Sequence, residues 1–264
     1  MGNNQSPALP EPKMPDKIAT TSLEPSPEPP WSISSALILL VWFVLVQLGF
    51  FLPLSLLAHG FGGHDFSLPF SPILFSVIAT ISGLLISHLA AWAGVVYLLR
   101  MRHGVSLVRG LALNNPPFFL LLPTFLGGFL LQFAAALLTF FLPPPPDFQI
   151  PFQIFQLAGV PGLTALAILA LVMAPWLEEA LFRGVLFPAL RRKYAFFPSA
   201  LIVTILFTGL HGSQTGDYWP GLLGIAACGY ILAWLRETTC SLWPPIMFHT
   251  GFNATAFAAM VASV

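Results

Sequence analysis

The sequence predicts an all-α protein whose helices form a bundle across a membrane. Of its 264 residues, 56% are hydrophobic and only 8% are charged, whereas a soluble globular domain carries about 25% charged residues. Its apolar runs have the length that a membrane-spanning helix needs, about 20 residues. Acidic and basic residues are equal in number, which argues against a nucleic-acid-binding protein. We therefore expect a multi-pass membrane protein in contact with the lipid bilayer.

The start of the chain differs in composition from the rest. The stretch MGNNQSPALPEPKMPDKIATTSLEPSPEPP is rich in proline and polar residues and has no apolar periodicity. This composition is typical of a disordered segment. We expect a disordered, Pro-rich cytoplasmic tail over residues 1–33 and a transmembrane domain over residues 34–264.

Seven apolar segments follow the tail and predict seven membrane spans. They cover residues 34–58, 72–99, 118–142, 162–190, 197–211, 220–236 and 243–263. Lysine and arginine residues lie in alternate connections between these segments, so the positive-inside rule places the N-terminus in the cytoplasm and the C-terminus outside. The compact chain favours the inner, cytoplasmic membrane of a bacterium.

Very few charged residues lie inside the predicted spans. The acids there are Glu178 and Glu179, and the base is Arg183. Charges are costly in hydrocarbon, so they face the protein interior and mark functional sites. Glu179 and Arg183 are four residues apart on one helix face and can pair, while Glu178 lies about 100° around the helix. Glu178 is thus the candidate general base, and the alternative is a polar cluster that only packs helices.

Histidine and asparagine side chains lie on two later segments. His249 and Asn253 are four residues apart and share a helix face, and His211 ends the fifth segment. Counting about 1.5 Å per residue from the helix ends places all three near the depth of Glu178. These four residues could therefore line one cavity. His88, on the second segment, fits a core residue and a neighbour of the site equally well.

The polar residues belong to three motifs, EEALFRG at 178–184, FTGLH at 207–211 and HTGFN at 249–253. These resemble the E-E-x-x-x-R, F-x-x-x-H and H-x-x-x-N motifs of the CPBP intramembrane proteases. This family is also called the CAAX protease and bacteriocin-processing, or abortive-infection, family. The resemblance covers a catalytic core at about residues 160–260, with no motif position substituted. The related eukaryotic CAAX prenyl endopeptidases generally have eight membrane helices, which leaves eight spans as an alternative to seven.

The resemblance implies an endopeptidase that hydrolyses a peptide bond of a membrane-associated protein or peptide. Glu178, helped by His211, would deprotonate the attacking water, and His249 and Asn253 would polarise the developing oxyanion. The motif residues Glu179 and Arg183 complete the implied catalytic set.

A metal ion and two other functions stay open at this point. Two histidines and a carboxylate are also a zinc ligand set, so Glu178, His211 and His249 could hold one divalent ion, zinc above others. The HExxH helix of many zinc proteases is absent from the sequence. The alternative functions are a non-catalytic scaffold or bacteriocin-immunity protein of the same family, and a proton or ion carrier that uses the buried charges.

Overall fold

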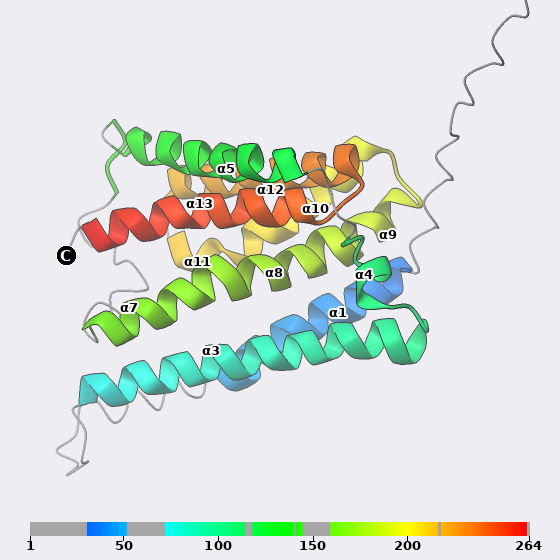
Figure 1. Ribbon diagram of the computed structural model, residues 1–264, viewed down its shortest axis with the longest axis horizontal. Helices are drawn as coiled ribbons and strands as arrows, with labels where there is room; N and C mark the ends of the chain where they lie inside the picture. The colour runs from blue at the N-terminus through cyan, green and yellow to red at the C-terminus, as the bar shows by residue number, and fades with distance from the viewer. Residues whose placement is uncertain are drawn as a thin grey trace, which may run out of the picture.

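The computed structural model describes residues 31–51, 72–113, 118–139, 141–144, 159–215 and 218–262. All regular secondary structure in these ranges is helical, and the long helices run alongside one another (Figure 1). The predicted all-α fold is therefore confirmed. Most of the predicted tail, residues 1–30, lies outside the described residues.

The first half of the chain forms the outer helices of the bundle. The Oγ atom of Ser32 caps the first helix by accepting the N–H of Ser35. Two of the helices continue into short π-helical segments, in which the backbone bonds reach five residues back. The elements are α1 (Ile33–Val46), η1 (Gln47–Phe51), α3 (Pro72–Tyr97), η2 (Leu98–Arg102), α4 (Leu107–Gly110) and α5 (Phe118–Leu138).

One long, uninterrupted helical rod follows, from Gly159 to Arg191. It alternates between α-helical and π-helical segments and lies between α3 and α13 in Figure 1. Its segments are α7 (Gly159–Ile168), η3 (Leu169–Met173), α8 (Ala174–Glu179), η4 (Ala180–Leu186) and α9 (Phe187–Arg191). The last helices are α10 (Phe196–Leu210), α11 (Gly212–Thr215), α12 (Trp219–Thr239) and α13 (Trp243–Ala262).

Five of the described helices are long and apolar enough to cross a membrane, whereas the sequence predicted seven segments. They are Ile33–Phe50, Val77–Arg102, Phe118–Leu138, Gly159–Arg191 and Trp219–Thr239. Helix α10 is apolar but has only 15 residues. Helix α13 has 20 residues, but its prolines, His249 and Asn253 lower its mean hydropathy.

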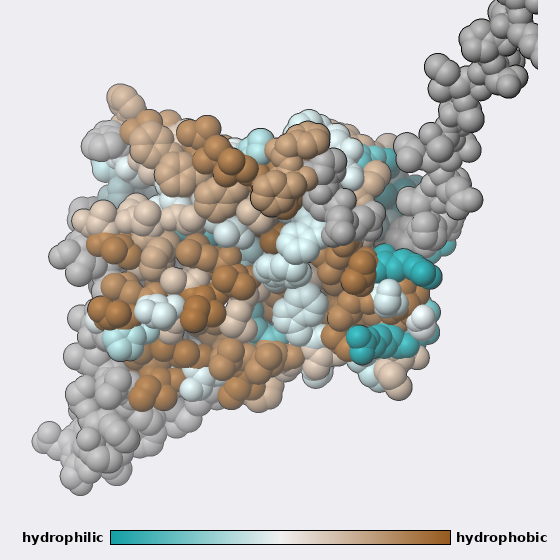
Figure 2. All heavy atoms as spheres, viewed as in Figure 1, coloured by the Kyte–Doolittle hydropathy of each residue, from teal (hydrophilic) through white to brown (hydrophobic). Residues whose placement is uncertain are grey.

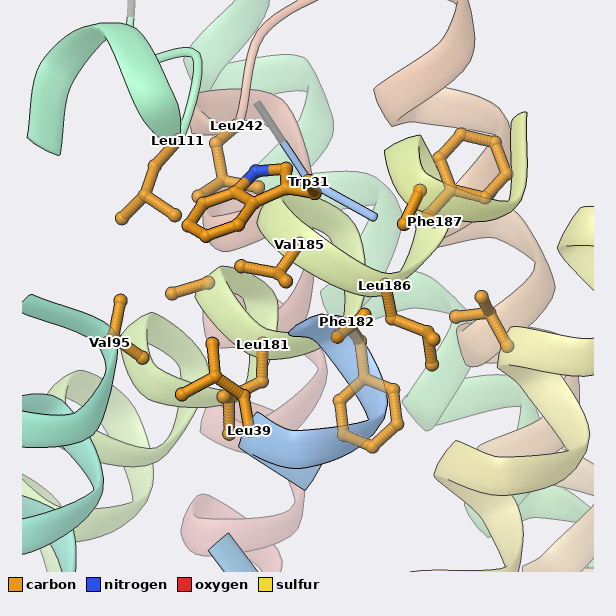
Figure 3. Packing of buried hydrophobic residues seen from close by; sticks show 14 of the residues in the cluster. Trp31, Leu39, Val95, Leu111, Leu181, Phe182, Val185, Leu186, Phe187 and Leu242 are labelled. Carbon is orange, nitrogen blue, oxygen red and sulfur yellow. The ribbon is translucent and has the colours of Figure 1, made fainter. Parts of the chain in front are cut away.

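A hydrophobic core surrounds the second half of the rod. Every residue from 179 to 190 is buried, and side chains of α1, α3 and the α4 region pack against this stretch (Figure 3). Trp31 is fully buried in this core and donates its indole N–H to the carbonyl of Gly110, at 3.2 Å.

The face of the bundle that Figure 2 shows is largely apolar. Large hydrophobic side chains of α1, α3, α5 and α10 are exposed. On α5, Phe118 is 83% and Leu130 is 61% exposed. A soluble protein rarely exposes such a continuous apolar surface, but lipid acyl chains would cover it at no cost.

Helices α5 and α13 cross with their backbones in direct contact. A Cβ atom at Gly128 of α5 would collide with the carbonyl oxygen of Phe248, and one at Gly251 of α13 would collide with that of Phe125. Glycine at both positions allows this approach. Because Gly251 lies between His249 and Asn253, the crossing fixes the depth of the α13 motif in the bundle.

Candidate active site

Glu179 and Arg183 form a fully buried ion pair on the rod. An Nη1 atom of Arg183 lies 2.9 Å from Oε1 of Glu179, and both side chains are 0% exposed. The Nη2 atom of Arg183 donates to the carbonyl of Gly229 on α12, at 2.7 Å. The pairing predicted from the four-residue spacing is therefore confirmed. Pairing and hydrogen bonding offset much of the cost of burying the two charges.

Glu179 also orients a histidine of a second helix, which the sequence did not reveal. The Nδ1 atom of His249 lies 3.0 Å from the same Oε1 atom that Arg183 contacts. A carboxylate oxygen accepts hydrogen bonds, so in this contact Nδ1 of His249 carries the proton. In a neutral ring the Nε2 atom of His249 then holds a lone pair.

His211 is oriented in a comparable way by its own helix. Its Nδ1 atom lies 2.8 Å from the carbonyl oxygen of Phe207, and a carbonyl only accepts. Nδ1 of His211 therefore carries the proton, and its Nε2 atom is also an acceptor in the neutral ring.

Both Nε2 atoms face the same oxygen of Glu178. The Oε2 atom of Glu178 lies 3.5 Å from Nε2 of His211 and 3.8 Å from Nε2 of His249. This oxygen is buried and has no hydrogen-bond partner among the described residues. Three acceptors from three helices thus face one another. Such an arrangement favours a molecule or ion that can donate to, or bind, all of them, such as water or a proton.

Phe207 connects the charged pair to both histidines. The guanidinium of Arg183 lies over its ring, at 4.6 Å from the ring centroid. The ring centroids of His211 and His249 lie 4.5 and 5.7 Å away. The spacing F-x-x-x-H therefore places an aromatic ring one turn below the histidine. Cation–π contact with this ring is a further reason why Arg183 tolerates burial.

Asn253 lies one turn from His249, but its side chain forms a hydrogen bond with the rod and not with the histidines. Its Nδ2 atom donates to the carbonyl of Ala170 in η3, at 2.8 Å. An amide group has two N–H donors, so one of them remains for another partner. The predicted role of Asn253 at an oxyanion stays a prediction.

His88 approaches the site from α3. Its side chain is buried, and its Nδ1 atom lies 2.8 Å from the carbonyl oxygen of Leu84. Helix α3 packs against α8, the segment that carries Glu178. The sequence left the role of His88 open between core residue and neighbour of the site, and both interpretations agree with this packing.

The donors at the site have the chemistry of a zinc set. Glu178, His211 and His249 offer one carboxylate oxygen and two imidazole nitrogens, and the opposite ring nitrogens are engaged as zinc ligands require. Within the described ranges, however, no group of three His, Cys, Asp or Glu side chains has the geometry that a metal ion needs. The metal site stays a prediction, and no step below depends on it.

Comparison with known proteins finds relatives of the part of the chain that carries these residues. A family model described as "Type II CAAX prenyl endopeptidase Rce1-like" matches residues 160–255. The "Putative membrane peptidase YdiL" of Bacillus subtilis (strain 168) is 34% identical over 86 residues, or 33% of each chain. The chain thus aligns with about a third of the length of this relative. No solved structure matches the chain.

All six motif residues lie within the matched range. The described helices, five of them long and apolar, and this relative indicate a multi-pass membrane protein. Residues 160–255 form a domain of the Rce1-like type II CAAX prenyl endopeptidase family, as the three motifs predicted.

Proposed function

We propose that this protein is an intramembrane endopeptidase in which Glu178 activates water to hydrolyse a peptide bond. The observation that carries this proposal is the convergence of His211 and His249 on one oxygen of Glu178, at 3.5 and 3.8 Å. Charged side chains are costly at this depth, and a site of catalysis is a reason to keep them there. The family domain supports a peptidase rather than a carrier of ions.

A water molecule suits the three facing acceptors. It can donate one hydrogen to Glu178 and the other to the Nε2 atom of His211. Its own lone pair then remains free to attack a carbonyl carbon. The apolar surroundings keep other water away and strengthen these electrostatic contacts.

Hydrolysis then follows from proton transfer between this water and Glu178. As the water oxygen bonds to the scissile carbonyl carbon, Glu178 takes its proton. The C–N bond then breaks, and the amine leaves with the proton that Glu178 returns. The second N–H of Asn253 is our candidate donor to the developing oxyanion.

Glu179 and Arg183 serve this reaction by holding His249. The carboxylate fixes the ring and its tautomer, and Arg183 holds that carboxylate in position. We propose that neither residue contacts the substrate directly.

We further propose seven membrane spans, with the N-terminus in the cytoplasm of a bacterium-like cell and the site within its inner membrane. The two spans beyond the five long apolar helices are α10 and α13. Helix α10 follows three basic residues at 191–193, as a span entering from the cytoplasm does. The substrate is a membrane-associated protein or peptide, which reaches the site from the bilayer.

The decisive test is Glu178→Gln, which keeps the shape of the side chain but cannot take a proton. Wild type and variant are purified in detergent and given a farnesylated peptide that ends in a CAAX sequence. In parallel, membrane proteomes of cells with either form are searched for a precursor that accumulates. We expect about a 100- to 10,000-fold loss of cleavage, with unchanged thermal unfolding.

Two outcomes would contradict this assignment. Cleavage that survives Glu178→Gln would exclude Glu178 as the base. A cellular phenotype that survives it, with no precursor in either proteome, would favour a non-catalytic scaffold or immunity protein. Activity that a chelator abolishes and zinc restores would instead assign Glu178, His211 and His249 as metal ligands.

A further inference from the structure

The rod that carries Glu178 contains two junctions of the same construction, each a π-helical segment followed by a proline. At the first, the N–H of Ala174 bonds to the carbonyl of Leu169, five residues back, and Pro175 follows. We call this the upstream junction. At the downstream junction, the N–H of Phe187 bonds to the carbonyl of Phe182, and Pro188 follows.

Each proline leaves a carbonyl that the rod itself does not satisfy. A carbonyl in such a helix accepts from the N–H four or five residues later. For Ala170 these are residue 174, whose N–H bonds to Leu169, and Pro175, which has no N–H. Arg183 stands in the same relation to residue 187 and Pro188. A buried carbonyl without a partner costs free energy.

Side chains of other helices donate to these carbonyls. Asn253 of α13 donates to Ala170 at 2.8 Å, and the Nε atom of Arg236 on α12 donates to Arg183 at 3.2 Å. A third donor supports the upstream junction. The Oγ1 atom of Thr250 donates to Leu171 at 3.2 Å, the carbonyl whose α-helical partner would be the missing N–H of residue 175.

The two junctions bracket the segment that carries Glu178, Glu179 and Arg183. The helices that donate to these carbonyls also carry the groups that contact the side chains of this segment. His249 lies on α13, and the carbonyl of Gly229 lies on α12. A carbonyl that can bond only across helices ties the backbone of the rod to these helices at both ends of the segment.

We propose that Pro175 and Pro188 leave backbone carbonyls of the rod without a partner in their own helix. Thr250 and Arg236 donate to the carbonyls of Leu171 and Arg183 and thereby act as positioning residues for the segment that carries Glu178. The purpose given to these residues rests on the proposed function, whereas the hydrogen bonds at the two junctions do not depend on it. It also changes the role of Arg236, which from the sequence is a cytoplasmic loop charge. In the structure this residue belongs to α12 and is only partly exposed.

Double-mutant cycles test the two junctions without any measurement of catalysis. Thr250→Val removes one donor and Arg236→Met removes the other, while Pro175→Ala and Pro188→Ala each return a backbone N–H to the rod. Thermal unfolding is followed in detergent micelles. We expect each donor variant to lower the midpoint by about 3 to 8 °C, because it leaves a partly buried carbonyl without this donor.

The pattern of coupling identifies the mechanism. Pro175→Ala should remove at least half of the loss caused by Thr250→Val, and Pro188→Ala at least half of that caused by Arg236→Met. The crossed pairs, Thr250→Val with Pro188→Ala and Arg236→Met with Pro175→Ala, are the controls and should be additive. Additive effects in the matched pairs, or equal coupling in the crossed pairs, would overturn the proposal.

A spectroscopic readout tests positioning apart from stability. In protein labelled with ¹⁵N-histidine, the ring signals of His211 and His249 report on their surroundings, and each is assigned by its loss in the corresponding His→Asn variant. Thr250→Val should shift the His249 signals at a temperature where the protein is fully folded, and Thr250→Ser should restore them. Unshifted signals in Thr250→Val would show that this hydroxyl only stabilises. Neither result depends on whether a substrate is cleaved.

Discussion

Helix α5 and the rod from Gly159 to Arg191 are both long and apolar, yet α5 and the second half of the rod occupy opposite environments. On α5 the described side chains are mostly exposed, and Gly128 is its buried residue. On the rod, every residue from 179 to 190 is buried, including Glu179 and Arg183. Lipid and protein interior are equally apolar, so hydropathy alone does not separate a lipid-facing helix from a buried one. Buried polar residues such as Glu179 and Arg183 distinguish the buried helix from the lipid-facing one.

The contrast also shows where free energy is stored in this bundle. An apolar side chain on α5 has nearly the same free energy in contact with lipid as in contact with protein. A buried charge on the rod depends on its partners, because losing one leaves the other unpaired in an apolar interior. We therefore expect polar contacts of the rod to dominate stability, followed by close backbone contacts, and then by single polar residues of the outer helices.

The largest effect on stability is expected from Arg183→Met. It removes the partner of Glu179 and the bond to the carbonyl of Gly229, and leaves a buried carboxylate unpaired. Removing one member of a buried pair costs about 3 to 5 kcal/mol. Unfolding by a denaturant or by heat in detergent micelles would measure this loss.

Arg191 offers a matched control at the end of the same rod. It pairs with Glu237 at 2.7 Å, but the two side chains are 30% and 34% exposed. Arg191→Met should cost about 1 kcal/mol or less, because surface pairs contribute little. Equal losses for the two variants would mean that burial does not set the importance of these charges.

The sequence predicted the local part of the site and the helical class of the fold. Spacing of four residues was sufficient for the pair of Glu179 and Arg183, since residues on one turn of one helix meet regardless of the rest of the fold. Counting residues from helix ends also placed His211 and His249 near the depth of Glu178, because the depth of a residue in a membrane helix depends mainly on its distance along the helix axis.

Contacts between helices could not be predicted in the same way. The bond from His249 to Glu179 depends on how α13 is rotated about its axis, which no local pattern fixes. The π-helical segments shift the face of the rod by a fraction of a turn, so α-helical geometry would misplace its side chains. Pro175 and Pro188, which lack a backbone N–H, indicate that backbone carbonyls of their own helix need donors from other helices. The predicted count of seven spans is not shown by hydropathy and length alone, because polar residues lower the mean hydropathy of α13.

A smaller loss is expected where α5 and α13 touch. A methyl group at Gly128 would collide with the backbone of α13, which cannot move without displacing His249. Gly128→Ala should therefore cost about 1 to 3 kcal/mol, as overpacking does, although alanine is the better helix former. Thermal unfolding would measure the change.

Gly127 is the control for this substitution because it is the preceding residue of the same helix. A Cβ atom there would lie 3.2 Å from the ring of Phe248, and a ring can shift by a few tenths of an ångström. Gly127→Ala should be near neutral. If both variants behave alike, the α5 contact is not the constraint on α13 that the backbone geometry indicates.

The smallest effect is expected at His88, where an outer helix reaches the buried site. It lies on α3, which packs against the α8 segment that carries Glu178, although α3 lies outside the matched family domain. His88→Phe should lower the rate of cleavage by about 3- to 10-fold, or about 0.7 to 1.4 kcal/mol at the transition state. His88→Gln should lower it less, since the amide stays polar. Ser87→Ala is the control: its hydroxyl donates to the same Leu84 carbonyl as His88 contacts, at 2.9 Å. A rate that falls equally in Ser87→Ala would assign the effect to the packing of α3. The outer helices would then affect the site only through packing and not through a polar side chain.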